Sequence, residues 1–270
     1  MIKKYFFMSG LPRSGNTLLS SLLSQNKKIK VSGYSVVCDI ISNIDEIKTY
    51  DKYKNIPDEK SLDNVITSVL DNYYKDWDCE YIIDRGNWGT PKNLHLLKRY
   101  FKDDIKIISP VRDFLEVMSS MLKKYNHVLN KDILHQSERL HSYYIDEIEY
   151  KCDLLMHFDG IMEASLLSVK NLCSEENRKY AKFIEYNDLV DNPQEQLNSI
   201  YDFLGIERYT NHQFENISQF YQNSIAYNDH YKSVPDLHVL KNTIQKSDTS
   251  IDILSDRAKL KYSDFNFWRK

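Results

Sequence analysis

The sequence has few cysteines and no long hydrophobic run. Its four cysteines, Cys38, Cys79, Cys152 and Cys173, stand too far apart to form a CxxC pair, which argues against a zinc site and against a disulfide framework. No stretch approaches the roughly 18 apolar residues needed to span a membrane. The apolar run at Tyr5–Met8 is too short for the core of a signal peptide. We therefore expect a cytoplasmic protein with reduced thiols and no membrane partner.

The sequence also has no excess of positive charge and no linker-like segment. The formal net charge is −3, whereas a protein that binds nucleic acid over its surface is generally basic. The 270 residues include only 7 glycines and 6 prolines, and no run of these residues separates two parts of the chain. Because 41% of the residues are hydrophobic, the chain can bury a core, which excludes global disorder. We predict a single domain over residues 1–270, without a nucleic-acid partner.

Short apolar segments typical of buried strands alternate with segments of helical spacing. The expected strands are Ile2–Ser9, Glu80–Asp84, Ile105–Val111 and Lys182–Tyr186. The expected helices are Thr17–Ser24, most of 40–74 with a break at Pro57, Lys92–Phe101, Phe114–Tyr125, one or two within 132–175, and Pro193–Leu204. Residues 31–38 are expected to be irregular or extended. This alternation predicts an α/β fold of three layers, with a mainly parallel central sheet flanked by helices and with helical insertions.

The segment Gly10–Thr17, GLPRSGNT, lies between the first expected strand and the first expected helix. Its spacing, G-x-x-x-x-G-x-T, is typical of a loop that binds phosphate through backbone N–H groups and a helix N-terminus, so we expect a P-loop-like sandwich. Asn16 replaces the lysine of nucleotide triphosphatases, and Arg13 brings a positive charge into the loop. That lysine contacts the β- and γ-phosphates. The sequence therefore favours an anion bound without Mg²⁺ over ATP or GTP hydrolysis, and a turn without a ligand is the alternative.

A second cation follows the third expected strand. Arg112 lies at the end of this strand, and Ser119 and Ser120 lie about two helical turns further on. An arginine can bind phosphate or sulfate through two parallel hydrogen bonds. The alternative is that Arg112 forms an ion pair with Asp113 or Glu116 at the start of the helix, and that Ser120 is a surface hydroxyl.

These motifs together resemble those of the sulfotransferases that use 3′-phosphoadenosine 5′-phosphosulfate (PAPS) as donor. The PRSG sequence of the loop is most similar to that of the tyrosine-protein sulfotransferase branch, and a strand ending in VR with a serine eight residues later is similar to the family's 3′-phosphate motif. The segment EYNDLV at 185–190, followed by FLGI at 203–206, is similar to a third family motif, in which the tyrosine lies near the adenine. The resemblance covers roughly residues 5–24, 80–125 and 182–207. It implies a P-loop α/β fold, PAPS as donor, 3′-phosphoadenosine 5′-phosphate (PAP) as product, and no metal.

The resemblance also implies roles for particular residues. The residues expected to bind the donor are Leu11, Pro12, Arg13, Ser14, Gly15, Asn16, Thr17, Arg112, Ser120, Tyr186 and, from the tail, Lys232 or Lys241. Arg13 and Arg85 are expected to stabilise the charge that develops on the bridging and leaving oxygens. The tail from about residue 209 is expected to cover the substrate and nucleotide. The acceptor is expected to be a hydroxyl or an amine of a small molecule, a glycan or a peptide.

The general base stays open at this point. The tyrosine-protein branch carries a glutamate after its first helix, where this chain has only Asp39. Asp84 is a second candidate, and its alternative is a buried carboxylate paired with Arg13 or Arg85. His230 and His238 are further candidates, because histidine titrates near neutral pH. The remaining candidate for the pocket, Trp88, is expected to line it or to belong to the core.

Two other functions stay open beside sulfuryl transfer. A P-loop kinase or NTPase would bind ATP with Mg²⁺, and the missing lysine argues against it. A non-catalytic module would bind PAP without turnover. A homodimer is the assembly that base rates favour.

Overall fold

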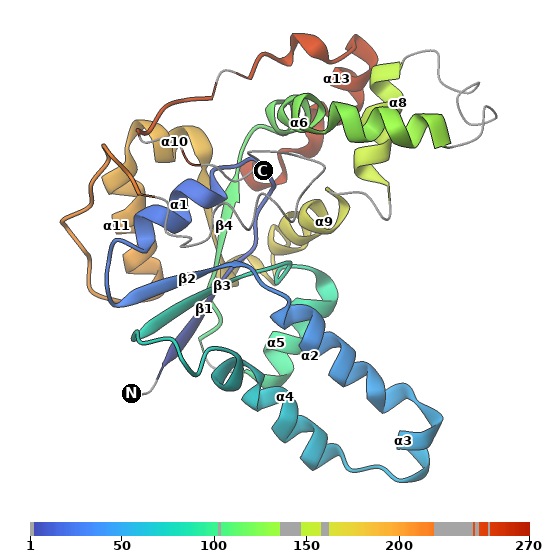
Figure 1. The fold of residues 1–270 in the computed structure, drawn as a ribbon, viewed down its shortest axis with the longest axis vertical. Coiled ribbons are helices and arrows are strands. Elements are labelled where there is room, and N and C mark those ends of the chain that lie inside the picture. Colours follow the sequence, from blue (N-terminus) through green and yellow to red (C-terminus); the bar gives the residue numbers. More distant parts are fainter. Residues whose placement is uncertain are drawn as a thin grey trace.

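The computed structural model describes residues 3–101, 104–135, 147–157, 162–218, 240, 243–247 and 249–270. Its centre is a sheet of five parallel strands in the order β2-β3-β1-β4-β5 (Figure 1). The strands are β1 Lys4–Met8, β2 Ile29–Tyr34, β3 Tyr81–Arg85, β4 Ile107–Val111 and β5 Ala181–Glu185. Helices cover both faces of this sheet, which confirms the predicted three-layer α/β fold.

The sequence predicts four of these strands, and β2 is the fifth. It pairs with β3 from Ile29 opposite Tyr81, and the register shifts between Val31 and Tyr34. The strand IKVSGY carries only two buried apolar side chains, which is too few for its sequence pattern to indicate a strand. The segment expected to be irregular or extended is therefore extended up to Tyr34, and a helix begins at Val37.

The helices predicted from the sequence are present in the expected order. Two further helices, Tyr186–Asp191 and Asp256–Tyr262, were not predicted, and the helix that begins at Phe114 continues to His135 instead of ending at Tyr125. They are α1 Asn16–Leu23, α2 Val37–Glu46, α3 Asp51–Asn55, α4 Glu59–Tyr73, α5 Pro91–Tyr100, α6 Phe114–His135, α8 Glu147–Met156, α9 Glu163–Leu172, α10 Tyr186–Asp191, α11 Pro193–Leu204 and α13 Asp256–Tyr262. Short 3-10 turns lie at Ile47–Thr49, Arg178–Tyr180, Ile251–Ile253, Ser263–Phe265 and Phe267–Arg269. The break expected at Pro57 separates α3 from α4, whose N-terminus is capped by the Asp58 carboxylate. None of the helices in the described part of the chain is both long and apolar enough to span a membrane.

Successive side chains of the strands point to opposite faces of the sheet. Phe6 and Ile83 pack into the layer that contains α1 and α11. Phe7 and Ile82 pack into the opposite layer, which contains α2, α4 and α5. The two layers lie on opposite sides of the sheet in Figure 1. The face on which a side chain lies follows from its position in the strand. This alternation therefore decides which polar side chains at the strand ends can contact one another.

The carboxyl ends of β1, β3 and β4 lie at one edge of the sheet. The chain passes from β1 to β2 and β3 on one side of β1, and then to β4 and β5 on the other side. In open parallel sheets, ligands bind in the crevice where the strand order reverses in this way. The loop at Gly10–Thr17 follows β1 and therefore lies at this position.

Candidate active site

A cavity of about 540 Å³ opens at the carboxyl ends of the central strands. It is lined by Met8, Gly10, Pro12, Arg13, Gly15, Asn16, Thr17, Leu18, Tyr34, Arg85, Gly86, Asn87, Arg112, Met121, Tyr125, Ser165, Tyr186, Leu240, Thr243, Ile244, Gln245 and Ser247. The wall thus brings together three arginines that come from the ends of three neighbouring strands. Their positive charge makes the cavity suited to an anionic ligand.

The loop after β1 has the backbone of an anion-binding turn. Gly10 lies so close to β4 that an added Cβ would be 2.2 Å from the Pro110 carbonyl oxygen. Arg13 and Gly15 both have positive φ, 59° and 78°. Gly15 is the N-cap residue of α1, and no side chain caps this helix end. The N–H groups of the first turn are therefore available to an anion in the cavity.

The Asn16 side chain closes the loop on itself. Its Nδ2 donates to the Leu11 carbonyl oxygen at 2.7 Å, so the position of the missing lysine is used to brace the turn. Leu11 and Ser14 are completely buried and do not line the cavity, and the Ser14 hydroxyl is directed at the Pro12 carbonyl. Among the loop residues expected to bind the donor, these two can contribute only through the backbone.

Arg13 lies close to the second predicted anion site. Its Nε donates to Ser120 Oγ at 3.2 Å, which joins the loop after β1 to helix α6. Burial, and then the nearby guanidinium of Arg112, lower the pKa of Arg13. Two guanidinium groups held this close repel one another, and an anion bound between them would relieve that repulsion.

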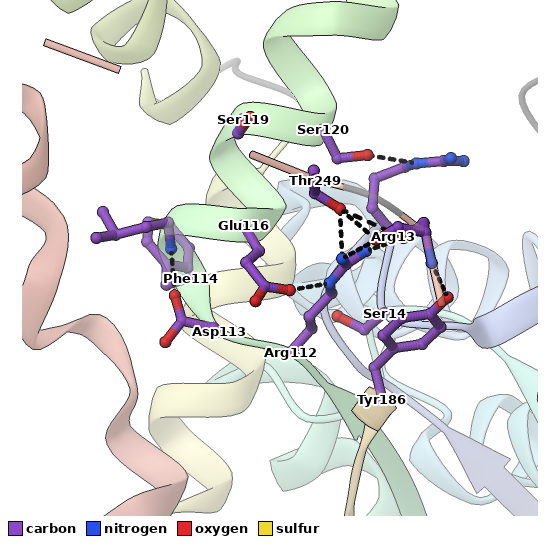
Figure 2. A network of polar contacts seen from close by, with 12 residues as sticks. Arg13, Ser14, Arg112, Asp113, Phe114, Glu116, Ser119, Ser120, Tyr186 and Thr249 are labelled. Carbon is purple, nitrogen blue, oxygen red and sulfur yellow. Dashed lines mark hydrogen bonds and ion pairs between the residues drawn. The ribbon is translucent and has the colours of Figure 1, made fainter. Parts of the chain in front are cut away.

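Arg112 lies at the centre of the polar network in Figure 2. It is only 3% exposed. Its Nε donates to Glu116 at 2.7 Å, which is the ion pair considered as an alternative, and its guanidinium lies 4.4 Å from the centre of the Tyr186 ring. The ion pair uses Nε and leaves the two terminal nitrogens of the guanidinium for other acceptors, and Arg112 belongs to the cavity wall. The ion pair and an anion site are therefore compatible.

A segment of the tail crosses this site. We call residues 243–247, Thr249 and Ser250 the strap. Arg112 donates through Nη1 to Ser247 Oγ at 2.7 Å and through Nη2 to Thr249 Oγ1. The Tyr186 hydroxyl bridges the same segment, because it donates to the Gln245 carbonyl and accepts from the Ser247 N–H. The strap holds the cation and the aromatic ring in one cluster.

Arg85 and Asp84 point to opposite faces of the sheet. Arg85 faces α1, lines the cavity and donates through Nη1 to Ser20 Oγ at 3.3 Å. Asp84 is completely buried on the other face, where its carboxylate accepts hydrogen bonds from Ser35, Tyr74 and Trp88. The structure therefore does not bring Asp84 to the cavity as a base, and the expected pairing with Arg13 or Arg85 is absent from its described hydrogen bonds.

Burial raises the pKa of Asp84 to about 6, although all three hydrogen-bond donors act in the opposite direction. Its donors tie together the ends of three segments, at Ser35, Tyr74 and Trp88. Trp88 is 1% exposed and packs on the Phe7 ring. It therefore belongs to the core and does not line the cavity. This carboxylate is part of the framework behind the cavity wall.

The other base candidates lie away from the cavity or outside the described chain. Asp39 is exposed in the first turn of α2 and does not line the cavity. His230, Lys232, His238 and Lys241 lie outside the described residues. In the described part of the chain, no group of three or more His, Cys, Asp or Glu side chains is placed to hold a metal ion.

Several residues of the wall were not singled out from the sequence. Asn87 follows Arg85 in the same strand-end loop, and Met121 and Tyr125 lie one turn apart on α6, just after Ser120. The rule that parallel strand ends meet could have indicated Asn87, and helical spacing could have indicated the pair on α6. The strap gives no such signal, because its sequence is polar and without periodicity.

Comparisons with known proteins are consistent with this architecture. The family model described as "Sulfotransferase family" matches residues 6–211. A sulfotransferase domain from the curacin biosynthetic pathway has a similar fold, with a TM-score of 0.55 at 16% identity over 97% of this chain and 98% of that one. A sulfotransferase from Alicyclobacillus acidocaldarius gives a TM-score of 0.48 at 15% identity, over 86% of this chain and 92% of that one. No curated protein matches the sequence. Because the family model spans most of the chain, the chain belongs to the sulfotransferase family.

Proposed function

We propose that the chain transfers a sulfuryl group from PAPS to a hydroxyl or amine acceptor by in-line displacement. The observation that carries this proposal is the convergence of Arg13 and Arg112 on one cavity, beside a helix N-terminus that no side chain caps. PAPS has two anionic ends, a 5′-phosphosulfate and a 3′-phosphate. A site with two separate cationic positions suits such a molecule better than a site built for a single phosphate chain.

The residues present fit each part of the donor. The loop and Arg13 would bind the 5′-phosphosulfate through backbone N–H groups and a guanidinium. Arg112 and Ser120 would bind the 3′-phosphate, and Tyr186, which stacks with Arg112, would pack beside the adenine. On binding, the phosphate has to compete for Arg112 with the hydroxyls of Ser247 and Thr249. This competition couples donor binding to the strap.

PAPS would supply the sulfuryl group, whose bond to the phosphate oxygen breaks as the bond to the acceptor forms. Arg13 would stabilise the negative charge that grows on the leaving phosphate and the bridging oxygen, and Arg85 would contact the oxygens of the sulfuryl group. Arg85 cannot act as an acid at neutral pH, because a guanidinium does not release its proton there. The acceptor proton needs a base, for which His230 and His238 stay candidates, because neither Asp39 nor Asp84 lines the cavity. The acceptor is a small molecule, a glycan or a peptide.

The test is calorimetric titration of PAP without metal, beside ATP with Mg²⁺. We expect PAP to bind without metal, and Arg112→Ala to weaken it about ten- to hundredfold, because one charged phosphate contact is lost. The matched control is Arg208→Ala, which removes an exposed arginine that pairs with Asp202 away from the cavity. This control should leave the affinity unchanged.

Two outcomes favour the other functions. If the protein binds ATP only with Mg²⁺ and does not bind PAP, the result would favour the function of a P-loop kinase or NTPase. Tight binding of PAP without any sulfuryl transfer from PAPS to a broad panel of phenols, alcohols, sugars and amines would favour the non-catalytic module.

A further inference from the structure

We propose that Ser20 is a positioning residue for the transfer. Its hydroxyl holds the Arg85 guanidinium against α1 and links it to the anion-binding loop through Asn16. The inference rests on the proposed function, because it concerns Arg85 as the cation at the sulfuryl end of the donor.

The contacts of Ser20 define the orientation of its hydroxyl. Ser20 is completely buried in the second turn of α1. Its Oγ donates to the Asn16 carbonyl oxygen at 2.7 Å and accepts from Arg85 Nη1 at 3.3 Å. A serine hydroxyl has a single proton. Because that proton goes to Asn16, the lone pairs of the oxygen are left to receive the guanidinium.

The main chain of Arg85 is well anchored, but its long side chain needs a separate contact. The Arg85 N–H donates to Ser32 Oγ at 2.7 Å, and its carbonyl accepts from the Ser35 N–H at 2.7 Å. These bonds fix the strand end and leave several rotatable bonds between the Cα and the charged group. A hydrogen bond at the guanidinium itself restricts those rotations. Ser20 provides one such bond, from the helix that begins after the Gly10–Thr17 loop.

Asn16 extends the link into the loop and to the next strand. Its side-chain amide donates to the Leu11 carbonyl at 2.7 Å, and the Leu11 N–H donates to the Pro110 carbonyl at 2.9 Å. A continuous series of hydrogen bonds therefore runs from Arg85 through Ser20 and Asn16 to β4. A cation fixed in this way relative to the loop does not have to reorganise when charge develops on the donor.

The chain offers a matched control next to Ser20. Ser21 is 2% exposed on the same helix, and its hydroxyl has no hydrogen-bond partner among the described residues. Ser20→Ala and Ser21→Ala therefore each remove one buried hydroxyl from α1, and only Ser20→Ala removes the contact with Arg85. Their unfolding midpoints in urea, compared with wild type, report any general effect on the fold.

The experiment compares the dissociation constants of PAPS and PAP, which differ only by the sulfuryl group, for wild type and for each variant. Arg85→Ala should weaken PAPS binding about tenfold or more, because the charge-assisted hydrogen bond from the guanidinium is lost. Ser20→Ala should weaken PAPS binding about fivefold, because the guanidinium is no longer held in position. Neither change should alter the affinity for PAP by more than about twofold. Ser21→Ala should leave both constants at the wild-type value. In the Arg85→Ala background, Ser20→Ala should have no further effect.

The result separates this inference from the proposed function. If wild type binds no PAP, the proposed function is wrong. If PAP binds and Ser20→Ala changes the preference for PAPS no more than Ser21→Ala does, the positioning role is wrong and the proposed function stands. If Arg85→Ala leaves the ratio of the two constants unchanged, Arg85 does not contact the sulfuryl end, and the positioning role is again wrong.

Discussion

Gly15 is required in the loop for two reasons, its backbone conformation and its close approach to Tyr186. It adopts φ 78°, and an added Cβ would lie 2.9 Å from Cδ2 of the Tyr186 ring. Gly205, at the end of α11, has a similar φ of 68°, but its added Cβ would meet only the flexible end of Lys106 at 3.8 Å. Both positions require the left-handed backbone that glycine adopts without strain. Only Gly15 also requires the absence of a side chain.

Gly15→Ala and Gly205→Ala should therefore differ in their effect on ligand binding. Each should lower the free energy of unfolding by about 1 kcal/mol, because alanine is strained at positive φ. Gly15→Ala should in addition displace the Tyr186 ring and weaken PAP binding at least about tenfold. Gly205→Ala should leave PAP binding unchanged. Urea unfolding and calorimetric titration measure the two effects. Equal PAP affinity in both variants would show that the contact between the loop and Tyr186 is not needed.

At the scale of elements, the segment after α11 folds back on that helix through His212. The His212 side chain is 7% exposed, its Nε2 lies 3.3 Å from the Tyr201 hydroxyl, and its ring packs edge-on against Tyr209. Burial lowers the pKa of His212 from 6.5 to about 4. Below this pH the ring has to carry a charge among aromatic side chains, which favours release of the segment from α11.

The pH dependence of stability should contain a contribution from His212. Because the pKa in the folded state lies below the value in the unfolded state, the contribution is fully present above about pH 6.5 and is lost as the pH falls through about 4. The expected loss is about 3 kcal/mol by pH 4. Urea unfolding between pH 7.5 and 4 measures it, and His212→Phe should lack this part of the decrease. A parallel decrease in wild type and variant would assign the loss to other groups.

At the scale of the whole molecule, the C-terminal residues complete a core cluster that includes Val111 at the end of β4. Leu254, Tyr262 and Trp268 pack with buried residues of α6 and α9. The Trp268 indole N–H donates to Glu185 at the end of β5 at 2.7 Å. Arg269, which is partly exposed, pairs with the same carboxylate. The last residues of the chain are thus attached to the central sheet through a buried ring and a surface ion pair.

Trp268→Ala should lower the free energy of unfolding by about 3–5 kcal/mol, because a large buried ring is removed and a cavity remains. Arg269→Ala should cost less than about 1 kcal/mol, because exposed ion pairs contribute little. Guanidinium unfolding followed by circular dichroism measures both. If Trp268→Ala unfolds like wild type, the C-terminal residues are not part of the cooperative folding unit.

The α/β class, four of the five strands and the position of the loop at Gly10–Thr17 between β1 and α1 could be predicted, because each depends on local sequence pattern. Buried strands and amphipathic helices are encoded by residues that are adjacent in the sequence. The placing of Arg13 near Arg112 also follows, since the carboxyl ends of parallel strands meet at one edge of the sheet. The contact between Arg13 and Ser120 extends this agreement to the start of α6.

What could not be predicted depends on contacts between distant segments. The strap meets Arg112 across more than a hundred residues of sequence, and polar residues without periodicity carry no sign of that contact. Asp84 and Arg85 are adjacent in β3, and neighbouring side chains of a strand point to opposite faces of the sheet. A difference of one position therefore places Arg85 in the cavity wall and Asp84 on the other face. The charged residues near a strand end do not determine that register, because it is set only when β3 pairs with β1 and β2.

The sequence by itself determined the fold class, the place of the Gly10–Thr17 loop between a strand and a helix, and the family, because local periodicity and short motifs carry that information. Only the tertiary structure decided that Asn16 braces the loop, that Asp84 is a buried framework residue and that Ser20 receives Arg85. These assignments depend on the direction of single side chains. That direction is fixed by packing between strands and helices that are far apart in the chain, and packing exists only once the chain has folded.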